Sequence, residues 1–153
     1  MIKTAEGNIL DAKEDIICHQ VNCKGVMGAG LAKQIKSKYP NMYKEYKHLC
    51  TEQGDKLLSS VQLITTNDGK TIANLFAQVG YGRKVKQTDY DALRSCLQSL
   101  KSTVTNPHEA KNRTSIAIPY GIGCGLAGGD WTIVEAMIED VLGNYEVTIY
   151  RFK

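Results

Sequence analysis

The sequence lacks the features of membrane-spanning and secreted proteins. No run of apolar residues approaches the roughly 20 that a membrane-spanning helix needs. The N-terminal stretch MIKTAEGNIL has no basic segment followed by an apolar one, which is the layout of a secretion signal. We therefore expect a cytoplasmic protein that does not enter a membrane.

The sequence also lacks a metal-binding cysteine pattern. Its 5 cysteines contain no CxxC pair, and nothing else in the sequence requires a metal or a cofactor. An odd number of cysteines in a chain without a secretion signal is typical of free, buried thiols. Cys124 stands among glycines and is the one candidate nucleophile, but no histidine lies near it in the sequence. We interpret it as a small apolar residue.

Strong charge of either sign is absent too. The formal net charge is +3, from 19 basic and 16 acidic side chains. This excess is compatible with a small anionic ligand but is weak for duplex binding, so we do not expect sequence-specific contact with nucleic acid. The densest basic run, GRKVKQ (82–87), is interpreted as a solvated loop.

What is present is the pattern of one α/β domain covering residues 1–153, with 42% apolar residues. Short apolar runs alternate with segments of helical period, which predicts a three-layer α/β/α sandwich around a central mixed sheet. The expected strands are 15–22, 60–66, 71–78, 114–119 and 145–152, and the expected helices are 31–40, 41–54, 88–104 and 131–143.

Capping residues give the expected helix boundaries. Asn41 is predicted to cap the second helix, and Gly54 to end it. Thr88 and Asp91 have the spacing of a capping box before the third helix. Asp130 is the candidate cap of the last helix.

Two glycine-rich segments each follow an expected strand and lead into a helix. They are NCKGVMGAGLAKQI (22–35), the first glycine segment, and IPYGIGCGLAGGDW (118–131), the second glycine segment. Glycine lets a phosphate approach backbone N–H groups closely, and the helix dipole favours an anion at a helix N-terminus. Neither segment is a Walker A loop or a clean GxGxxG motif. Two such segments at strand ends predict a site for a diphosphate.

These motifs carry a resemblance to a known family. GNIL at Gly7, VNCKGVMGAGLA (21–32), the second glycine segment and the final IYRF occur in the order and spacing of a macro domain, the ADP-ribose-binding fold. The chain most resembles the small branch that contains terminal ADP-ribose protein glycohydrolases and ADP-ribose 1″-phosphate phosphatases. The resemblance implies ADP-ribose or an ADP-ribosylated substrate as the binding partner, and we expect a monomer.

The resemblance also implies a set of ligand-binding residues. Asn8 stands where the family usually has an aspartate that accepts from the adenine amino group, and Ile9 would offer backbone to the adenine. Tyr150 and Phe152 would add surface near the adenine. The distal ribose and its phosphate would meet Asn22, Gly28, Ala29 and Gly30. The diphosphate would meet Gly121, Ile122, Gly123, Cys124, Gly125 and Leu126.

The catalytic residues of the branch are where this sequence departs from it. The glycohydrolases use a lysine and an aspartate, and these positions hold Gln78 and Ala127. Glutamine forms no covalent lysyl intermediate and alanine moves no proton, so the lysine mechanism is not supported.

Other side chains are left as candidates around the distal ribose. They are Asn22, Gln78, Tyr81 and Asp130, with Lys24 and His19 ranked below them. Asn22 and Asp130 are the catalytic candidates, and Asp130 is either a helix cap or a general base for water.

Three functions follow from these residues. The leading hypothesis is a hydrolase that acts at the distal ribose of ADP-ribose 1″-phosphate, O-acetyl-ADP-ribose or an ADP-ribosylated macromolecule. The second is a non-catalytic reader of ADP-ribose, which needs the pocket but neither the lysine nor the aspartate. The third is a module that binds RNA or poly(ADP-ribose), and the weak net charge disfavours it.

Overall fold

The computed structural model describes residues 2–82, 84–104 and 114–152, so Arg83 of the basic run 82–87 lies outside the described residues. Its centre is a six-stranded sheet in the order β1-β6-β5-β2-β4-β3. The strands are β1 (Ile2–Glu6), β2 (Ile16–Val21), β3 (Val61–Thr65), β4 (Thr71–Phe76), β5 (Ser115–Pro119) and β6 (Glu146–Arg151).

The sheet is mixed, as predicted. Neighbouring strands from β1 to β4 pair in parallel, and β3 pairs antiparallel with β4. Because both faces of the central parallel strands are covered, β2 and β4 are buried along almost their whole length and are mostly apolar.

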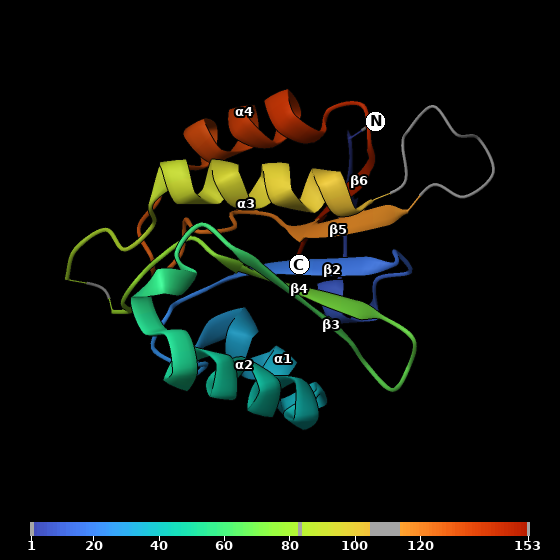
Figure 1. Ribbon diagram of the computed structural model, residues 1–153. Coiled ribbons are helices and arrows are strands. Elements are labelled where there is room, and N and C mark those ends of the chain that lie inside the picture. The colour runs from blue at the N-terminus through green and yellow to red at the C-terminus, as the bar shows by residue number, and fades with distance from the viewer. Residues whose placement is uncertain (1, 83, 105–113, 153) are drawn as a thin grey trace.

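Helices cover both faces of this sheet, which confirms the three-layer arrangement. Helices α1 (Gly30–Lys38) and α2 (Pro40–Gln53) lie on one face, and α3 (Tyr90–Thr103) and α4 (Trp131–Leu142) lie on the other (Figure 1). Two short 3-10 helices, η1 (Ile9–Asp11) and η2 (Gly54–Leu57), complete the described elements.

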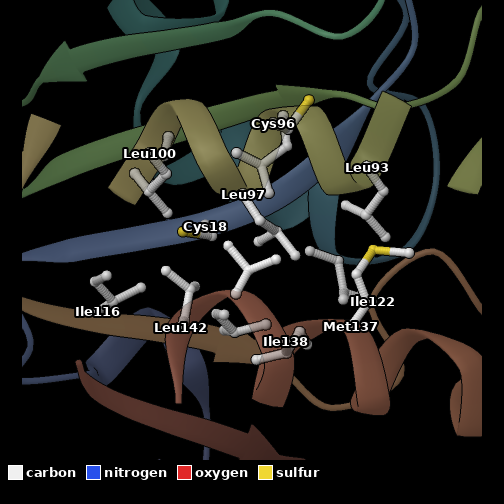
Figure 2. Close-up of a cluster of buried hydrophobic side chains, with 14 of the residues drawn as sticks. Cys18, Leu93, Cys96, Leu97, Leu100, Ile116, Ile122, Met137, Ile138 and Leu142 are labelled. Atoms are coloured by element: carbon white, nitrogen blue, oxygen red, sulfur yellow. The ribbon is translucent and has the colours of Figure 1, made fainter. Parts of the chain in front are cut away.

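The α3–α4 face holds an apolar core. Figure 2 shows Leu93 and Leu97 of α3 on one side and Ile138 and Leu142 of α4 on the other, with Cys18 of β2 between them in this view. The apolar stripe of α3 is fully buried, with Leu93, Cys96, Leu97 and Leu100 each at most 1% exposed. Removal of these side chains from water provides most of the packing energy on this face.

The predicted helix caps were partly wrong. Helix α2 begins at Pro40 with no side-chain cap, because proline fits the first helical position and needs no hydrogen-bond partner there, so Asn41 caps nothing. It ends at Gly54, as predicted. The cap of α3 is Asp89, whose side chain accepts from the N–H of Ala92 at 3.0 Å, so the predicted capping box at Thr88 does not form.

One strand was not predicted. β1 is an edge strand with two of its five residues half-buried and none fully buried, so its sequence carries little apolar pattern. It is held by parallel pairing with β6, from Ile2 opposite Val147 to Glu6 opposite Arg151. No helix among the described residues is long and apolar enough to cross a membrane.

Candidate functional site

A large cavity lies where the carboxyl ends of β2, β4 and β5 meet. Its volume is about 670 Å³. This is the edge at which open α/β sheets bind ligands, because the loops that leave neighbouring parallel strands gather there. Both glycine segments line it, through Asn22, Val26, Gly28, Ala29, Gly30, Leu31 and Ala32 of the first and Pro119, Tyr120, Gly121, Ile122, Gly123, Gly125, Leu126 and Ala127 of the second.

The first glycine segment offers the cavity an open helix end. Helix α1 starts at Gly30, and its N-cap residue Ala29 has no side chain that could accept a hydrogen bond from the first turn. The unpaired N–H groups of that turn belong to residues that line the cavity. An anion at this position would satisfy them and would be favoured by the helix dipole.

Asn22 holds the first glycine segment in shape. Its side-chain oxygen accepts from the N–H of Lys24 at 3.0 Å and from the hydroxyl of Tyr46 at 2.9 Å, and its amide donates to the carbonyl of Val26 at 2.8 Å. The residue is 6% exposed and lines the cavity. Since its oxygen is occupied by protein donors, only the second amide hydrogen of Asn22 is free to meet a ligand.

The second glycine segment is a succession of tight turns. The N–H of Ile122 donates to Pro119 at 3.1 Å, and the N–H of Cys124 donates to Gly121 at 2.8 Å. These two groups are therefore used inside the segment, unlike our expectation that they would serve a diphosphate. Among the described residues, the N–H groups of Gly123, Gly125 and Leu126 donate no hydrogen bond, and they remain the candidate donors.

Gly123 rests on a network of polar side chains. A Cβ at this position would lie 2.6 Å from the side-chain oxygen of Gln20, and its φ of +74° also favours glycine. The amide of Gln20 donates to Gln78 at 2.8 Å and to the hydroxyl of Thr88 at 2.9 Å. Thr88 in turn donates to the carbonyl of Gly123 at 2.6 Å. Through Gln20, strand β2 thereby supports the second glycine segment by way of hydrogen bonds to Gln78 and Thr88.

Gln78, at the position of the family lysine, belongs to this same network. Its oxygen accepts from Gln20, and its amide donates to the carbonyl of Gly80 at 2.7 Å. The residue is 9% exposed and lines the cavity. Both ends of the amide are therefore engaged in holding the loop that follows β4.

His19, which the sequence ranked low, lines the cavity from β2. It is 2% exposed, and its Nε2 lies 2.5 Å from the side-chain oxygen of Asn74. That oxygen is an acceptor, because the amide of Asn74 donates to Gln62 at 3.0 Å. Nε2 must then carry the proton, so Nδ1 is a buried acceptor without a partner. Burial lowers the pKa of His19 to about 4, and the ring is neutral at pH 7.

Asp130 does not line the cavity, although sequence reasoning made it a catalytic candidate. Its side chain accepts from the N–H of Thr132 at 2.9 Å, which makes it the N-cap of α4. Cys124 is also outside the cavity lining, and burial, helped by the charge of Asp130, raises its thiol pKa to about 11. A protonated thiol is a poor nucleophile, which agrees with our interpretation of Cys124 as a packing residue.

The residues predicted for the adenine are not among the residues that line the cavity. Asn8 caps η1 by accepting from the N–H of Leu10 at 2.9 Å, and Ile9 is buried in the core. The hydroxyl of Tyr150 donates to Glu14 at 2.6 Å, and Phe152 is exposed. Their contact with adenine stays a prediction.

The aromatic residues that do line the cavity are Tyr81 and Tyr120. Tyr81 is 58% exposed at the mouth, as its flanking glycines suggested. Tyr120 was not predicted; its ring lies 4.7 Å from Trp131 and 4.8 Å from the guanidinium of Arg151. Its place between a buried strand and the first glycine of the segment could have indicated a cavity residue.

Lys24 is turned to solvent, where it forms an ion pair of 2.9 Å with Asp55. In the described part of the chain, no cluster of histidine, cysteine, aspartate or glutamate could hold a metal ion. The side chains that the cavity offers a ligand are thus mostly neutral, and backbone N–H groups supply the anion-binding character.

The sheet order, the two glycine segments at one sheet edge and the cavity between them define an α/β domain built to bind a phosphorylated small molecule. The Macro domain family model matches residues 18–138, and the chain belongs to this family.

Two relatives match most of the chain. The ADP-ribose 1″-phosphate phosphatase of Saccharomyces cerevisiae is 25% identical over 173 residues, which cover 98% of each chain. The DNA ADP-ribosyl glycohydrolase of Mycobacterium tuberculosis is 31% identical over 139 residues, which cover 88% of this chain and 37% of that protein. The solved macrodomain of Mycobacterium tuberculosis DarG has a TM-score of 0.81 at 26% identity, covering 99% of this chain and 97% of that one.

Proposed function

We propose that the protein binds ADP-ribose in the cavity and hydrolyses a bond at the distal ribose, with ADP-ribose 1″-phosphate as the leading substrate. One observation carries the proposal: two glycine segments from neighbouring strands line a single cavity of about 670 Å³. One contributes an open helix N-terminus and the other contributes free turn N–H groups. This pair matches the two negative charges of a diphosphate.

The nucleophile in this proposal is water. Gln78 has both ends of its amide bound to protein groups, and Ala127 has no functional group. No lysine or carboxylate is among the cavity-lining residues of the described structure. Water attacks the phosphorus and gives a proton to the assigned base, the bond between phosphorus and the 1″ oxygen breaks, and that oxygen takes up the proton and leaves as a hydroxyl group. Backbone N–H groups stabilise the charge on the phosphoryl oxygens.

His19 is the side chain that we assign to the proton. Its Nδ1 carries a lone pair that no protein donor occupies, on a residue that lines the cavity, and the hydrogen bond to Asn74 fixes the ring. With a pKa of about 4 the ring is neutral at pH 7, and the proposal requires the buried Nδ1 to become exposed to the attacking water when substrate binds.

The relatives support the same reaction class without choosing one substrate. One relative that this chain matches over 98% of both proteins is named an ADP-ribose 1″-phosphate phosphatase. The mycobacterial relative, named a DNA ADP-ribosyl glycohydrolase, is longer, and this chain spans 37% of it. A phosphate at the 1″ position is accordingly our first choice, and ADP-ribosylated DNA is the second substrate to test.

The test is phosphate release from ADP-ribose 1″-phosphate by the wild-type protein, His19→Gln and Asp130→Ala. We expect turnover by the wild type and a fall of about 100-fold or more in His19→Gln, because general-base catalysis contributes about that factor. Asp130→Ala should keep full turnover and lose about 1 kcal/mol of stability with its helix cap. If turnover is lost in Asp130→Ala and kept in His19→Gln, the carboxylate of Asp130 rather than His19 is the general base.

Among the residues that the structure describes, no lysine and no carboxylate line the cavity, which also supports a second function, a non-catalytic reader of ADP-ribose. Calorimetry separates the possibilities. Heat on titration with ADP-ribose, together with no turnover of ADP-ribose 1″-phosphate or of ADP-ribosylated DNA, would favour the reader. No heat at millimolar ADP-ribose would contradict both functions.

A further inference from the structure

A second hollow, of about 600 Å³, lies on the surface of α1 and α2, away from the sheet. We call it the α1–α2 groove, and its lining is Lys36, Ser37, Pro40, Tyr43, Lys44, Lys47, His48 and Thr51. Four of these eight residues are basic, and none is acidic. The ligand-binding cavity shares no lining residue with it.

The charge of the protein is concentrated on these two helices. Residues 30–53 contain five lysines and two glutamates, so they account for the whole net charge of +3. The rest of the chain carries fourteen basic and fourteen acidic side chains and is neutral. The weak net charge that disfavoured a polyanion thus conceals one cationic surface on an otherwise balanced molecule.

The lysines of the groove are not neutralised by the protein. Among the described residues, Lys36, Lys44 and Lys47 form no ion pair, and of the two glutamates on α2, Glu52 pairs with His48 and Glu45 forms no ion pair. The ammonium group of Lys36 lies 4.1 Å from the centre of the Tyr43 ring. Unpaired lysines along a hollow with one aromatic ring are suited to a phosphodiester backbone.

The groove adjoins the back of the first glycine segment. The hydroxyl of Tyr43 donates to the carbonyl of Gly25 at 2.9 Å. The Cγ of Lys47 lies 3.5 Å from where a Cβ of Gly25 would stand. The front of the same segment lines the cavity through Val26, Gly28 and Ala29. A chain of phosphates in the groove would therefore lead to the segment at the cavity wall.

From these observations we infer that the α1–α2 groove binds the sugar–phosphate backbone of a single-stranded nucleic acid. Three lysines in a hollow of this size suit one strand, and contact through lysine alone reads no sequence. Binding in the groove does not depend on the reaction in the cavity. Only the further idea that the bound strand carries the ADP-ribose rests on the proposed function.

The test uses a labelled oligothymidylate without ADP-ribose, followed by fluorescence anisotropy as KCl is raised. Three neutralised phosphates give a slope of log Kobs against log[KCl] of about −2 for a single strand. The variant Lys36→Gln/Lys44→Gln/Lys47→Gln should lose at least about tenfold in affinity at low salt and nearly all of the slope. The control Lys3→Gln/Lys13→Gln/Lys101→Gln has the same net charge and should behave as the wild type.

The single variant Lys44→Gln, an exposed change, should reduce the slope by about 0.7. Calorimetry with ADP-ribose reports the cavity separately, and its heat should be unchanged in the groove variants. The inference fails if the oligonucleotide does not bind at low salt, or if the groove and control variants weaken equally. It also fails if phosphatidylserine vesicles bind through the same lysines and the oligonucleotide does not.

Discussion

The two glycine segments reach one cavity with different backbone architectures. The first runs straight into α1, whose N-terminus has no side-chain cap and stays open to a ligand. The second makes tight turns, uses four of its N–H groups in hydrogen bonds within the segment, and then meets α4, whose N-terminus is closed by Asp130. Both segments lead into a helix, but only the first presents an uncapped helix N-terminus to the cavity.

This difference explains why glycine is needed for different reasons in the two segments. In the second segment the chain folds back on itself, and the N–H of Gly129 donates to the carbonyl of Gly123 at 2.8 Å. In the first segment no atom other than one of Val26 comes within 4 Å of a Cβ built on Gly28. We infer that glycine serves the protein's own backbone in one segment and ligand access in the other.

The largest effect is expected from the same substitution made in each segment. Gly129→Ala places a Cβ 2.6 Å from the Gly123 carbonyl oxygen, which is backbone and cannot move aside, and should cost about 2 to 4 kcal/mol. Gly28→Ala should leave stability within about 1 kcal/mol of the wild type. Urea unfolding measures both. Equal losses would show that the two segments need glycine for one reason.

The next effect concerns the residues of β2 beneath the segments, where His19 is neutral and buried. Its folded pKa of about 4 is below the unfolded value of 6.5, so the unfolded state binds the extra proton between these values. The contribution of His19 to the free energy of unfolding is fully present above pH 6.5. It is lost as pH falls toward 4, and the loss amounts to about 3 kcal/mol.

The variant His19→Gln isolates this contribution. Between pH 7 and pH 4.5 the free energy of unfolding should decrease in both proteins, and the decrease should be about 2 to 3 kcal/mol smaller in the variant than in the wild type. Urea titration at each pH measures it. Gln20→Ala, on the other face of β2, is the control and should keep the wild-type pH dependence. Parallel pH profiles of His19→Gln and the wild type would contradict the buried neutral ring.

The smallest effect tests the open helix end directly. Ala29 has extended backbone geometry, which an aspartate N-cap adopts readily, so Ala29→Asp should stabilise α1 by about 1 kcal/mol. The same carboxylate would accept from the N–H groups of the first turn and repel a diphosphate, so the affinity for ADP-ribose should fall by about tenfold. Ala29→Asn caps without the charge and should weaken binding less. Tighter binding in Ala29→Asp would place the anion elsewhere.

Much of the fold was predictable because it depends on local patterns. The buried runs of β2 and β4 and the stripe of α3 read directly as strands and a helix. β1 did not, because an edge strand is defined by its partner β6 rather than by its own residues. The cap of α3 moved by one residue, since Thr88 was drawn into the network under Gly123.

The site was predictable as a place but not as a set of contacts. The glycine segments predicted a binding site at the strand ends, and Asp130 was predicted as a possible N-cap of the last helix. The tautomer and orientation of the His19 ring depend on its hydrogen bond to Asn74. That residue stands 55 positions away in the sequence, so no local pattern could predict the pairing. The cationic groove escaped notice because its lysines alternate with apolar residues and gather only when α1 packs on α2.

Strand β2 has an evolutionary consequence that follows from its alternation. His19 faces the α1–α2 side and bonds Asn74, while its neighbour Gln20 faces the other side and supports Gly123. A deletion or insertion of one residue within β2 would exchange these two roles at once. Homologous sequences should therefore vary in loop length around the cavity and show no length change between Ile16 and Val21.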